Sequence, residues 1–290
     1  MPPKILFLTS SGPNYQEDFL AHGLSKFCEV TDWGQKPSLR GYVGLDCFYF
    51  DLPLRSTAED QVRAELAAGY YDLVVCGSCR SSLQLEQILA LSPRPIALLE
   101  GEDTAGRFDH PNVGWFFQRE LTARPTGKEY PLQFGVCLDK IPTLHLPKVR
   151  DYYFCGLPSC ELRREVAAAL GCALQHEPDR DTYLRNIHQS HLGISIPGAG
   201  FDTVRYWEIP AVQTLLLTKR PTIIIRDNFV DMESAVFWDS VADLQEKIQY
   251  LIGKPEEVAR ITEAGYQHVL AHHTTEANAR YVLQTCGVLL

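Results

Sequence analysis

Residues 193–218 constrain the fold more than any other part of the chain. They begin with a short apolar run, pass through a glycine-punctuated turn at residues 198–200, and end in a second apolar run at residues 214–217. Between the turn and the second run lies a segment that carries Arg205 and Glu208. Short apolar runs joined through a helix are typical of parallel strands buried on both faces. We therefore expect a strand, a glycine loop, a short helix and a second strand here.

The residue types in this stretch suit a ligand that contains both phosphate and sugar. Gly198 and Gly200 allow backbone N–H groups to approach a ligand closely, and the helix that follows offers partial positive charge at its N-terminus. Arg205 can pair with a diphosphate, while Glu208 can accept hydrogen bonds from sugar hydroxyls. The stretch therefore predicts a nucleotide-sugar site. A tight turn beside a salt-bridged arginine and glutamate fits the same residues, so this alternative stays open.

Apolar runs and helical spacings alternate along the whole chain, and this alternation predicts doubly wound parallel sheets. A proline-containing segment without periodicity, residues 138–150, reads as a linker, and we place the domain boundary near Pro147. At 290 residues the chain is long enough for two such domains. We expect strands at residues 4–9, 28–32, 47–50, 71–76, 95–99, 151–156, 172–176, 192–196, 214–217 and 221–226. We expect helices at residues 14–27, 57–68, 83–90, 161–170, 183–189, 240–251, 255–269 and 275–283.

Composition excludes some classes of function. The formal net charge is -9, and no run of lysines and arginines appears, so we expect no nucleic-acid partner. The N-terminal apolar run is too short for a signal peptide or a membrane span. The 9 cysteines are an odd number without a disulfide-framework spacing, and we interpret them as free thiols in a cytoplasmic protein. The single Cys-x-x-Cys, at residues 76–79, reads as the end of a strand.

Two further groups of residues follow predicted strands, where ligands bind in parallel sheets. The acidic turn at residues 100–103 includes Glu102, which can orient an acceptor hydroxyl or act as a base. A solvated turn that caps the next helix is the alternative interpretation. Gly156 is placed to approach a diphosphate, and Arg163 or Arg164 can reach it, although both can equally be surface arginines.

The order of motifs in the second half resembles a known family. The sequence GFDTVRYWEIPA at residues 200–211 is followed by residues 231–238, a helix from Asp243, residues 264–266, His273-Thr274 and Arg280. Residues 151–283 thereby resemble the C-terminal half of CgeB-like (spore-maturation type) glycosyltransferases, which look like the family 1 and family 4 enzymes of the GT-B superfamily. The resemblance implies an α/β protein of two Rossmann-like doubly wound parallel-sheet domains that face a central cleft. Residues 1–146 would form the acceptor domain, with the C-terminal helix of residues 275–290 packing back on it, and residues 147–274 the nucleotide-sugar donor domain.

The same resemblance implies a glycosyltransferase of the hexosyl-transferring type. A sugar would pass from a nucleoside-diphosphate-sugar to a hydroxyl of a glycan, protein or small-molecule acceptor, with retention of anomeric configuration. We expect the chain to contain no Asp-x-Asp metal motif and therefore no metal or other cofactor. Loop amides, Arg205 and Lys219 would then neutralise the leaving diphosphate. The catalytic candidates are Glu208, Arg205 and Glu102. The donor-binding candidates are Gly156, Tyr183, Gly198, Gly200, Asp202, Thr203 and Glu233.

The sequence departs from the family 4 pattern at one position. Those enzymes contact the donor with two glutamates eight positions apart; Glu208 matches the second, but Gly200 stands at the place of the first. The contact to the sugar would then come from Asp202, from backbone amides or from Glu233. A non-catalytic module that binds a nucleotide or a glycan is the alternative function. An epimerase or dehydrogenase is disfavoured because no Gly-x-Gly-x-x-Gly follows the first strand.

Overall fold

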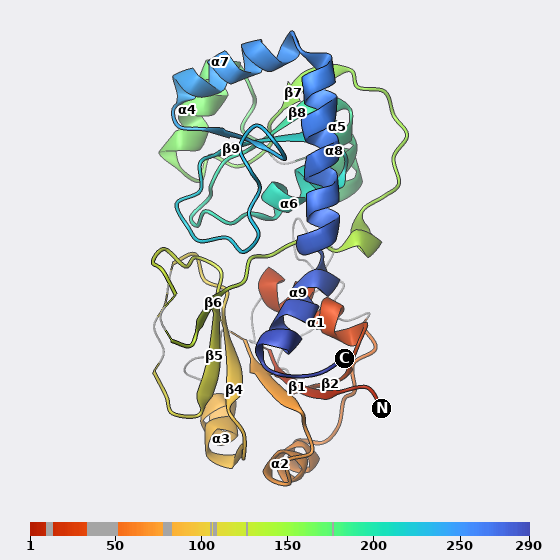
Figure 1. The fold of residues 1–290 in the computed structure, drawn as a ribbon, viewed down its shortest axis with the longest axis vertical. Coiled ribbons are helices and arrows are strands. Elements are labelled where there is room, and N and C mark those ends of the chain that lie inside the picture. Colours follow the sequence, from red (N-terminus) through yellow and green to blue (C-terminus); the bar gives the residue numbers. More distant parts are fainter. Residues whose placement is uncertain are drawn as a thin grey trace. The chain divides into compact units, whose positions relative to one another are not determined.

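The computed structural model describes residues 1–9, 14–33, 52–77, 83–104, 106, 109–125, 127–175 and 177–290. These residues form two compact units (Figure 1): Met1–Gln133 together with Thr275–Leu290, and Phe134–Thr274. The first unit thus ends earlier in the chain than residue 146. The reason is that the Phe134 N–H donates to the Asp202 carboxylate, so the chain has already joined the second unit at this point. The strand expected at residues 47–50 and Cys79 of the Cys-x-x-Cys lie outside the described residues.

The first unit contains a six-stranded sheet in the order β2-β1-β3-β4-β5-β6. Every neighbouring pair is parallel. The strands are β1 Lys4–Leu8, β2 Glu29–Asp32, β3 Leu73–Cys76, β4 Ile96–Glu100, β5 Val113–Gln118 and β6 Glu129–Pro131. The helices of this unit are α1 Tyr15–Ser25, α2 Glu59–Ala67, α3 Leu83–Leu91 and α9 Thr275–Thr285.

Alternation along β1 explains why this sheet is covered on both faces. Ile5 and Phe7 pack into one apolar cluster, which includes side chains of α1 and α9. Leu6 and Leu8 point the other way, into a cluster that includes side chains of α2 and α3. Successive side chains of a strand point to opposite faces, so a continuous apolar run requires a helical layer on each side.

The contact between α1 and α9 gives a testable consequence at Gly23. A Cβ atom at this position would lie 2.0 Å from the carbonyl oxygen of Thr275 and 2.9 Å from the Cβ of Ala279. Alanine normally favours a helix over glycine by about 1 kcal/mol. In Gly23→Ala we expect the opposite sign, a loss of about 1–3 kcal/mol in the free energy of unfolding, because the two helices must separate. Urea unfolding measures this loss, with Ser25→Ala as the control; a Gly23→Ala protein as stable as the parent would contradict the contact.

The second unit contains a four-stranded parallel sheet in the order β10-β9-β8-β7. Its apolar core joins side chains of these strands to those of the helices α4, α7 and α8. The strands are β7 Arg150–Tyr153, β8 Ser190–Ser195, β9 Leu215–Lys219 and β10 Val236–Trp238. The helices are α4 Glu161–Leu170, α5 Arg180–His188, α6 Val204–Ala211, α7 Val241–Ile252 and α8 Pro255–His272, and a 3-10 turn spans Leu138–Lys140.

Two expected strands of this unit are wrong. Residues 221–226 form no strand, because the position beside β9 is taken by Val236–Trp238. Ile223 is buried, but the two isoleucines after it are only half-buried. Residues 172–175 form no strand either, although the Gln175 carbonyl oxygen accepts a hydrogen bond from the Gly156 N–H at 3.1 Å. None of the helices in the described ranges combines the length and apolar character that a membrane span requires.

Candidate functional site

Two neighbouring parallel strands of the second unit, β7 and β8, are each followed by a glycine. Gly156 comes after β7 and Gly198 after β8. Parallel neighbours end at the same edge of a sheet, which is where ligands bind in open α/β folds. The helices that follow, α4 and α6, begin at Cys160 and Thr203 without a hydrogen bond from either capping side chain. Their first-turn N–H groups therefore lack the usual side-chain acceptor.

The guanidinium groups of Arg163 and Arg205 approach these glycines closely. A Cβ atom at Gly156 would lie 3.5 Å from Nη1 of Arg163 and 3.5 Å from Nη2 of Arg205. A Cβ atom at Gly198 would lie 3.3 Å from Nη2 of Arg163. Arg163 also donates to the carbonyl oxygens of Leu157, Ile196 and Pro197, at 3.3, 3.2 and 3.1 Å. The absence of side chains at the glycines thus leaves room for two cationic groups at one edge of the sheet.

The positive charge of this pair is not compensated by protein carboxylates. In the part of the chain that the structure describes, neither Arg163 nor Arg205 forms an ion pair, and the buried Nε of Arg205 has no hydrogen-bond partner. The guanidinium of Arg205 lies 5.7 Å from the ring centre of Phe154 and 5.9 Å from that of Tyr183. Burial and, secondarily, the charge of Arg205 lower the pKa of Arg163. A buried guanidinium beside a half-buried one, without ion-pair partners among the described residues, favours binding of an anion.

Glu208 lies near this pair but is already engaged by two protein side chains. It is 2% exposed, and its Oε1 forms an ion pair with Arg180 of α5. Its Oε2 accepts a hydrogen bond from the hydroxyl of Tyr183 at 3.0 Å. Burial and the Glu208 charge raise the pKa of Tyr183, so its hydroxyl stays protonated and donates. Arg180 was not among the predicted site residues, because no local pattern links it to the Glu208 carboxylate 28 residues away.

The residues around Arg180 show that the expected absence of an Asp-x-Asp motif is wrong. Asp179 and Asp181 do have the Asp-x-Asp spacing. The structure uses Asp179 as the N-cap of α5, where its two carboxylate oxygens accept from the Thr182 N–H at 2.7 Å and the Thr182 hydroxyl at 2.9 Å. Asp181 is exposed in the first turn of that helix. Asp179 therefore caps the helix whose first residue is Arg180.

Four of the predicted donor-binding residues lie in the loop before α6: Gly198, Gly200, Asp202 and Thr203. The carbonyl of Gly200 accepts from the Gly198 N–H at 2.9 Å and closes the turn. The hydroxyl of Thr203 lies 3.3 Å from that of Ser195. Asp202 is 3% exposed, and its carboxylate accepts from the Phe134 N–H and from the indole N–H of Trp207, both at 2.9 Å. The side chain of Asp202 therefore connects α6 to the start of the second unit.

Trp207 lies against His273, which is 2% exposed, with 4.2 Å between ring centres. Nε2 of His273 lies 2.7 Å from the carbonyl oxygen of Asp227. Because a carbonyl only accepts, Nε2 must carry the hydrogen and donate it. Burial lowers the pKa of His273 to about 3. This histidine is therefore neutral in the folded protein at ordinary pH.

The buried neutral state of His273 predicts a pH dependence of stability. The unfolded chain binds a proton near pH 6.5, whereas the folded state does so only near pH 3, so stability is full above pH 6.5 and falls as the pH drops through this window. Between pH 7 and pH 5 we expect a loss of about 2 kcal/mol from this residue. Urea unfolding at both pH values measures it. In His273→Phe the drop should be smaller by that amount, whereas replacing the exposed His191 with Asn should leave the drop unchanged; an equal drop in His273→Phe would contradict the assignment.

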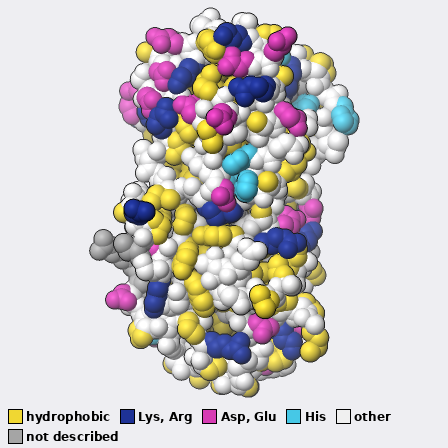
Figure 2. All heavy atoms as spheres, in the orientation of Figure 1, with side chains coloured by type: hydrophobic (Ala, Val, Ile, Leu, Met, Phe, Trp, Pro, Cys, Tyr) yellow, Lys and Arg dark blue, Asp and Glu magenta, His cyan; other side chains and the backbone are white. Residues whose placement is uncertain are grey.

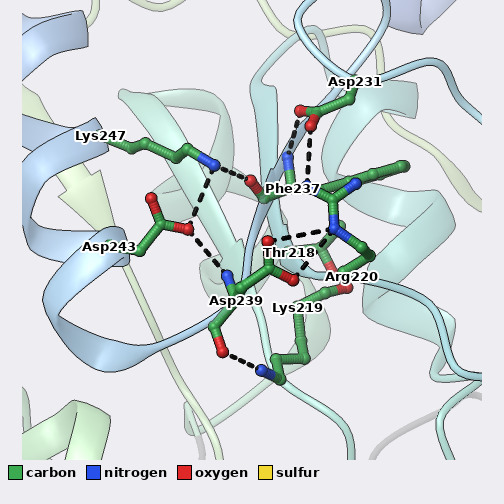
Figure 3. A network of polar contacts seen from close by, with 8 residues as sticks. All are labelled: Thr218, Lys219, Arg220, Asp231, Phe237, Asp239, Asp243 and Lys247. Carbon is green, nitrogen blue, oxygen red and sulfur yellow. Dashed lines mark hydrogen bonds and ion pairs between the residues drawn. The ribbon is translucent and has the colours of Figure 1, made fainter.

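The remaining predicted residues lie elsewhere. Lys219 donates to the Asp239 carbonyl at the ends of β9 and β10, within a polar network (Figure 3). In this network Arg220 pairs with Asp231 and Asp239. Glu233 is exposed on a turn, where its N–H donates to the Val230 carbonyl. Glu102 is exposed in the first unit, and its N–H lies 3.3 Å from Oε1 of Glu100.

The chain resembles known proteins in its fold and, over part of its length, in its sequence. Structural matches extend over nearly its whole length, onto glycosyltransferases of known structure. The fold is GT-B. In sequence, residues 163–284 match a family model described as "Glycosyl transferase-like". No curated protein matches the sequence significantly.

Three solved structures illustrate this likeness. A glycosyltransferase from Rickettsia africae is 11% identical, with a TM-score of 0.69 and 98% of each chain covered. HepE from Anabaena, in complex with UDP, is 10% identical, with a TM-score of 0.62, covering 99% of this chain and 100% of its own. Sucrose-phosphate synthase from Thermosynechococcus elongatus is 11% identical, with a TM-score of 0.61, covering 97% of this chain and 98% of its own. At these identities the matches establish the GT-B fold.

Proposed function

We propose that the protein is a glycosyltransferase whose second unit binds a nucleoside-diphosphate-sugar. The observation that carries this proposal is the pair Arg163 and Arg205, two cations at the glycine edge of the second sheet without protein counter-ions in the described residues. A diphosphate supplies the missing negative charge, and guanidinium groups bind it through two parallel hydrogen bonds. The GT-B fold and the glycosyltransferase-like sequence of residues 163–284 support the same function.

The reaction that we propose is transfer of a hexosyl group to a hydroxyl of an acceptor. As the bond to the diphosphate breaks, negative charge develops on the leaving oxygen, and Arg163 and Arg205 are fixed in advance to stabilise it. We propose on this ground that the diphosphate needs no metal ion. Retention of anomeric configuration is proposed from the resemblance to family 4 enzymes. Because the seven described cysteines are free thiols, we further propose a cytoplasmic location.

Glu208 and Tyr183 would define the sugar side of the site. Glu208 is held by Arg180, so a donor hydroxyl can either share its carboxylate or displace one of its partners. The proposed role of Glu102 is to orient the acceptor hydroxyl from the first unit. Gly156, Gly198 and Gly200 would bring backbone groups to the diphosphate.

A non-catalytic nucleotide-binding module is the second candidate. It is favoured by Gly200, which offers no side chain at the position of the first family glutamate, and by the two protein partners of the Glu208 carboxylate. The two candidates differ in turnover and not in nucleotide affinity.

A nucleotide screen followed by a turnover assay tests both. Binding of UDP, GDP, ADP, CMP, dTDP and their sugars is measured by thermal shift, with magnesium and with EDTA, because a ligand of the folded state raises its apparent stability. UDP is the first nucleotide to test, since a solved structure with this fold contains it. We expect one nucleotide to bind equally with and without magnesium, and its sugar to be turned over. Binding without turnover would support the module, and no binding to any nucleotide would overturn the donor site.

A further inference from the structure

The carboxyl end of the first unit's sheet contains a buried amide with an unsatisfied oxygen. Gln16, in the first turn of α1, is 2% exposed. Its Nε2 donates to the carbonyl oxygen of Leu132 at 2.6 Å, which fixes the orientation of the amide. Its Oε1 is buried and, among the residues that the structure describes, has no hydrogen-bond partner. Such an oxygen is rare in folded proteins and points to a missing donor.

The end of β4 lies directly against this oxygen. A Cβ atom at Gly101 would be 3.0 Å from Oε1 of Gln16 and 2.7 Å from Nδ2 of Asn14. The Oδ1 of Asn14 caps α1 by accepting from the N–H groups of Gln16 and Glu17, at 3.1 and 3.2 Å. The first turn of α1 therefore packs its amide groups closely against Gly101, at the edge of the sheet where ligands of α/β proteins bind.

Among the residues that the structure describes, the same edge carries more carboxylates than cations. Arg119 fixes the acidic turn: its Nε donates to the Gly101 carbonyl at 3.1 Å, and its other nitrogens pair with Asp103 and Glu120. The charge of this arginine is thereby offset within the turn. The carboxylates that the described residues place at this edge are those of Glu17, Glu100, Glu102, Asp103 and Glu120.

We propose that this edge binds an unphosphorylated sugar as the acceptor, with one hydroxyl donating to Oε1 of Gln16. This inference rests on the proposed glycosyltransferase function. A sugar hydroxyl supplies the hydrogen-bond donor that Oε1 lacks. Other hydroxyls of the sugar can donate hydrogen bonds to the neighbouring carboxylates. We expect a phosphorylated sugar to bind more weakly, because the carboxylates that the described residues place at this edge would repel its dianion.

The test is a binding titration of the full-length protein by ligand-observed NMR. The probes are the methyl glycosides of glucose, galactose, mannose and N-acetylglucosamine, each compared with the corresponding 6-phosphate sugar. We expect at least one methyl glycoside to bind and its 6-phosphate to bind more weakly. Gln16→Leu should weaken the glycoside by about tenfold, the value of one hydrogen bond to a buried acceptor. No binding by any methyl glycoside, or tighter binding by a phosphate, would overturn the proposal.

Two variants keep the test specific. Gly101→Ala keeps Gln16 but places a Cβ atom 3.0 Å from its Oε1 and 2.7 Å from Nδ2 of Asn14. It should weaken the same glycoside, and a thermal melt of the variant shows whether the shifted Asn14 cap also lowers stability. Gln118→Leu is the matched control, since Gln118 is 1% exposed but has both ends satisfied, by the Gly106 N–H and by Glu129. It should leave glycoside affinity unchanged; an equal loss in Gln118→Leu would make the effect of Gln16 merely structural. UDP affinity is measured on each preparation, so failure of the donor site and failure of this acceptor site give separate results.

Discussion

Replacing Arg205 with alanine is expected to raise the dissociation constant of the donor nucleotide roughly 10- to 100-fold, because a charge-assisted hydrogen bond contributes about 1.5–3 kcal/mol. The same change should not lower the melting temperature of the free protein. In the free state the guanidinium lies beside Arg163 and its Nε has no partner, so its removal relieves repulsion. Calorimetric titration with UDP and a thermal melt measure the two effects.

The neighbouring arginines provide the control for this experiment. Arg164 is exposed, and it pairs with Glu161 and the Pro158 carbonyl. Arg164→Ala should therefore leave nucleotide affinity unchanged. If Arg205→Ala lowered the melting temperature and left the nucleotide affinity intact, Arg205 would be a structural residue and the donor site would lie elsewhere.

Replacing Asp202 with alanine is expected to lower the free energy of unfolding by about 2–6 kcal/mol. The change leaves two buried donors, the Phe134 N–H and the Trp207 indole N–H, without an acceptor, and each unsatisfied donor costs about 1–3 kcal/mol. Urea unfolding measures the loss. Asp151→Ala is the control, because Asp151 is exposed and its removal should change stability by no more than about 0.5 kcal/mol.

This second experiment also decides what Asp202 does. As a donor-binding residue, it would lose nucleotide affinity on mutation while the protein stayed stable. The structure favours the opposite outcome, in which the folded fraction of Asp202→Ala binds UDP with the parent's affinity. A stable Asp202→Ala protein with weakened UDP binding would contradict the bonds to Phe134 and Trp207.

The elements that could be predicted from the sequence are those with local signals. Helix α7 begins where Ser240 accepts from the Asp243 N–H, a capping pattern visible in the sequence, and α8 begins at Pro255. Helix α4 has the expected bounds, residues 161–170. Residues 221–226 have the same apolar, β-branched character as a buried strand, but membership in the sheet was decided by competition with β10, which no local pattern records.

The candidate site likewise contains residues that could be predicted from the sequence and residues that could not. Gly156, Gly198 and Arg205 follow strands or begin a helix, so the order of elements alone predicts that they meet at one edge. Arg180 could not be predicted, because its bond to Glu208 joins two helices through tertiary packing. The role of Asp202 was missed because its backbone partner, Phe134, lies 68 residues earlier in the chain. That these residues bind a donor stays a prediction until the nucleotide titration is done.

On the face drawn in Figure 2, acidic and basic side chains are interspersed over both parts of the molecule. A mixed surface of this kind provides no extended positive field for a polyanion on that face. That the protein has no nucleic-acid partner stays a prediction. The titration of phosphorylated sugars tests the related expectation for the first unit.

The way the chain passes between the two units has a consequence for engineering. Val136 and Thr274, close to the two ends of the second unit, lie side by side in a parallel bridge. The chain leaves the first unit after Gln133 and returns to it at Thr275. Residues beside these two points are also joined, because the Asn278 amide donates to the Gln133 carbonyl. The second unit is thus a nested insertion: one uninterrupted segment whose ends adjoin. Such a segment can be exchanged as a single cassette while the recipient keeps its own first and last residues. Under the proposed function, donor preference would then move with the second unit between proteins of this fold.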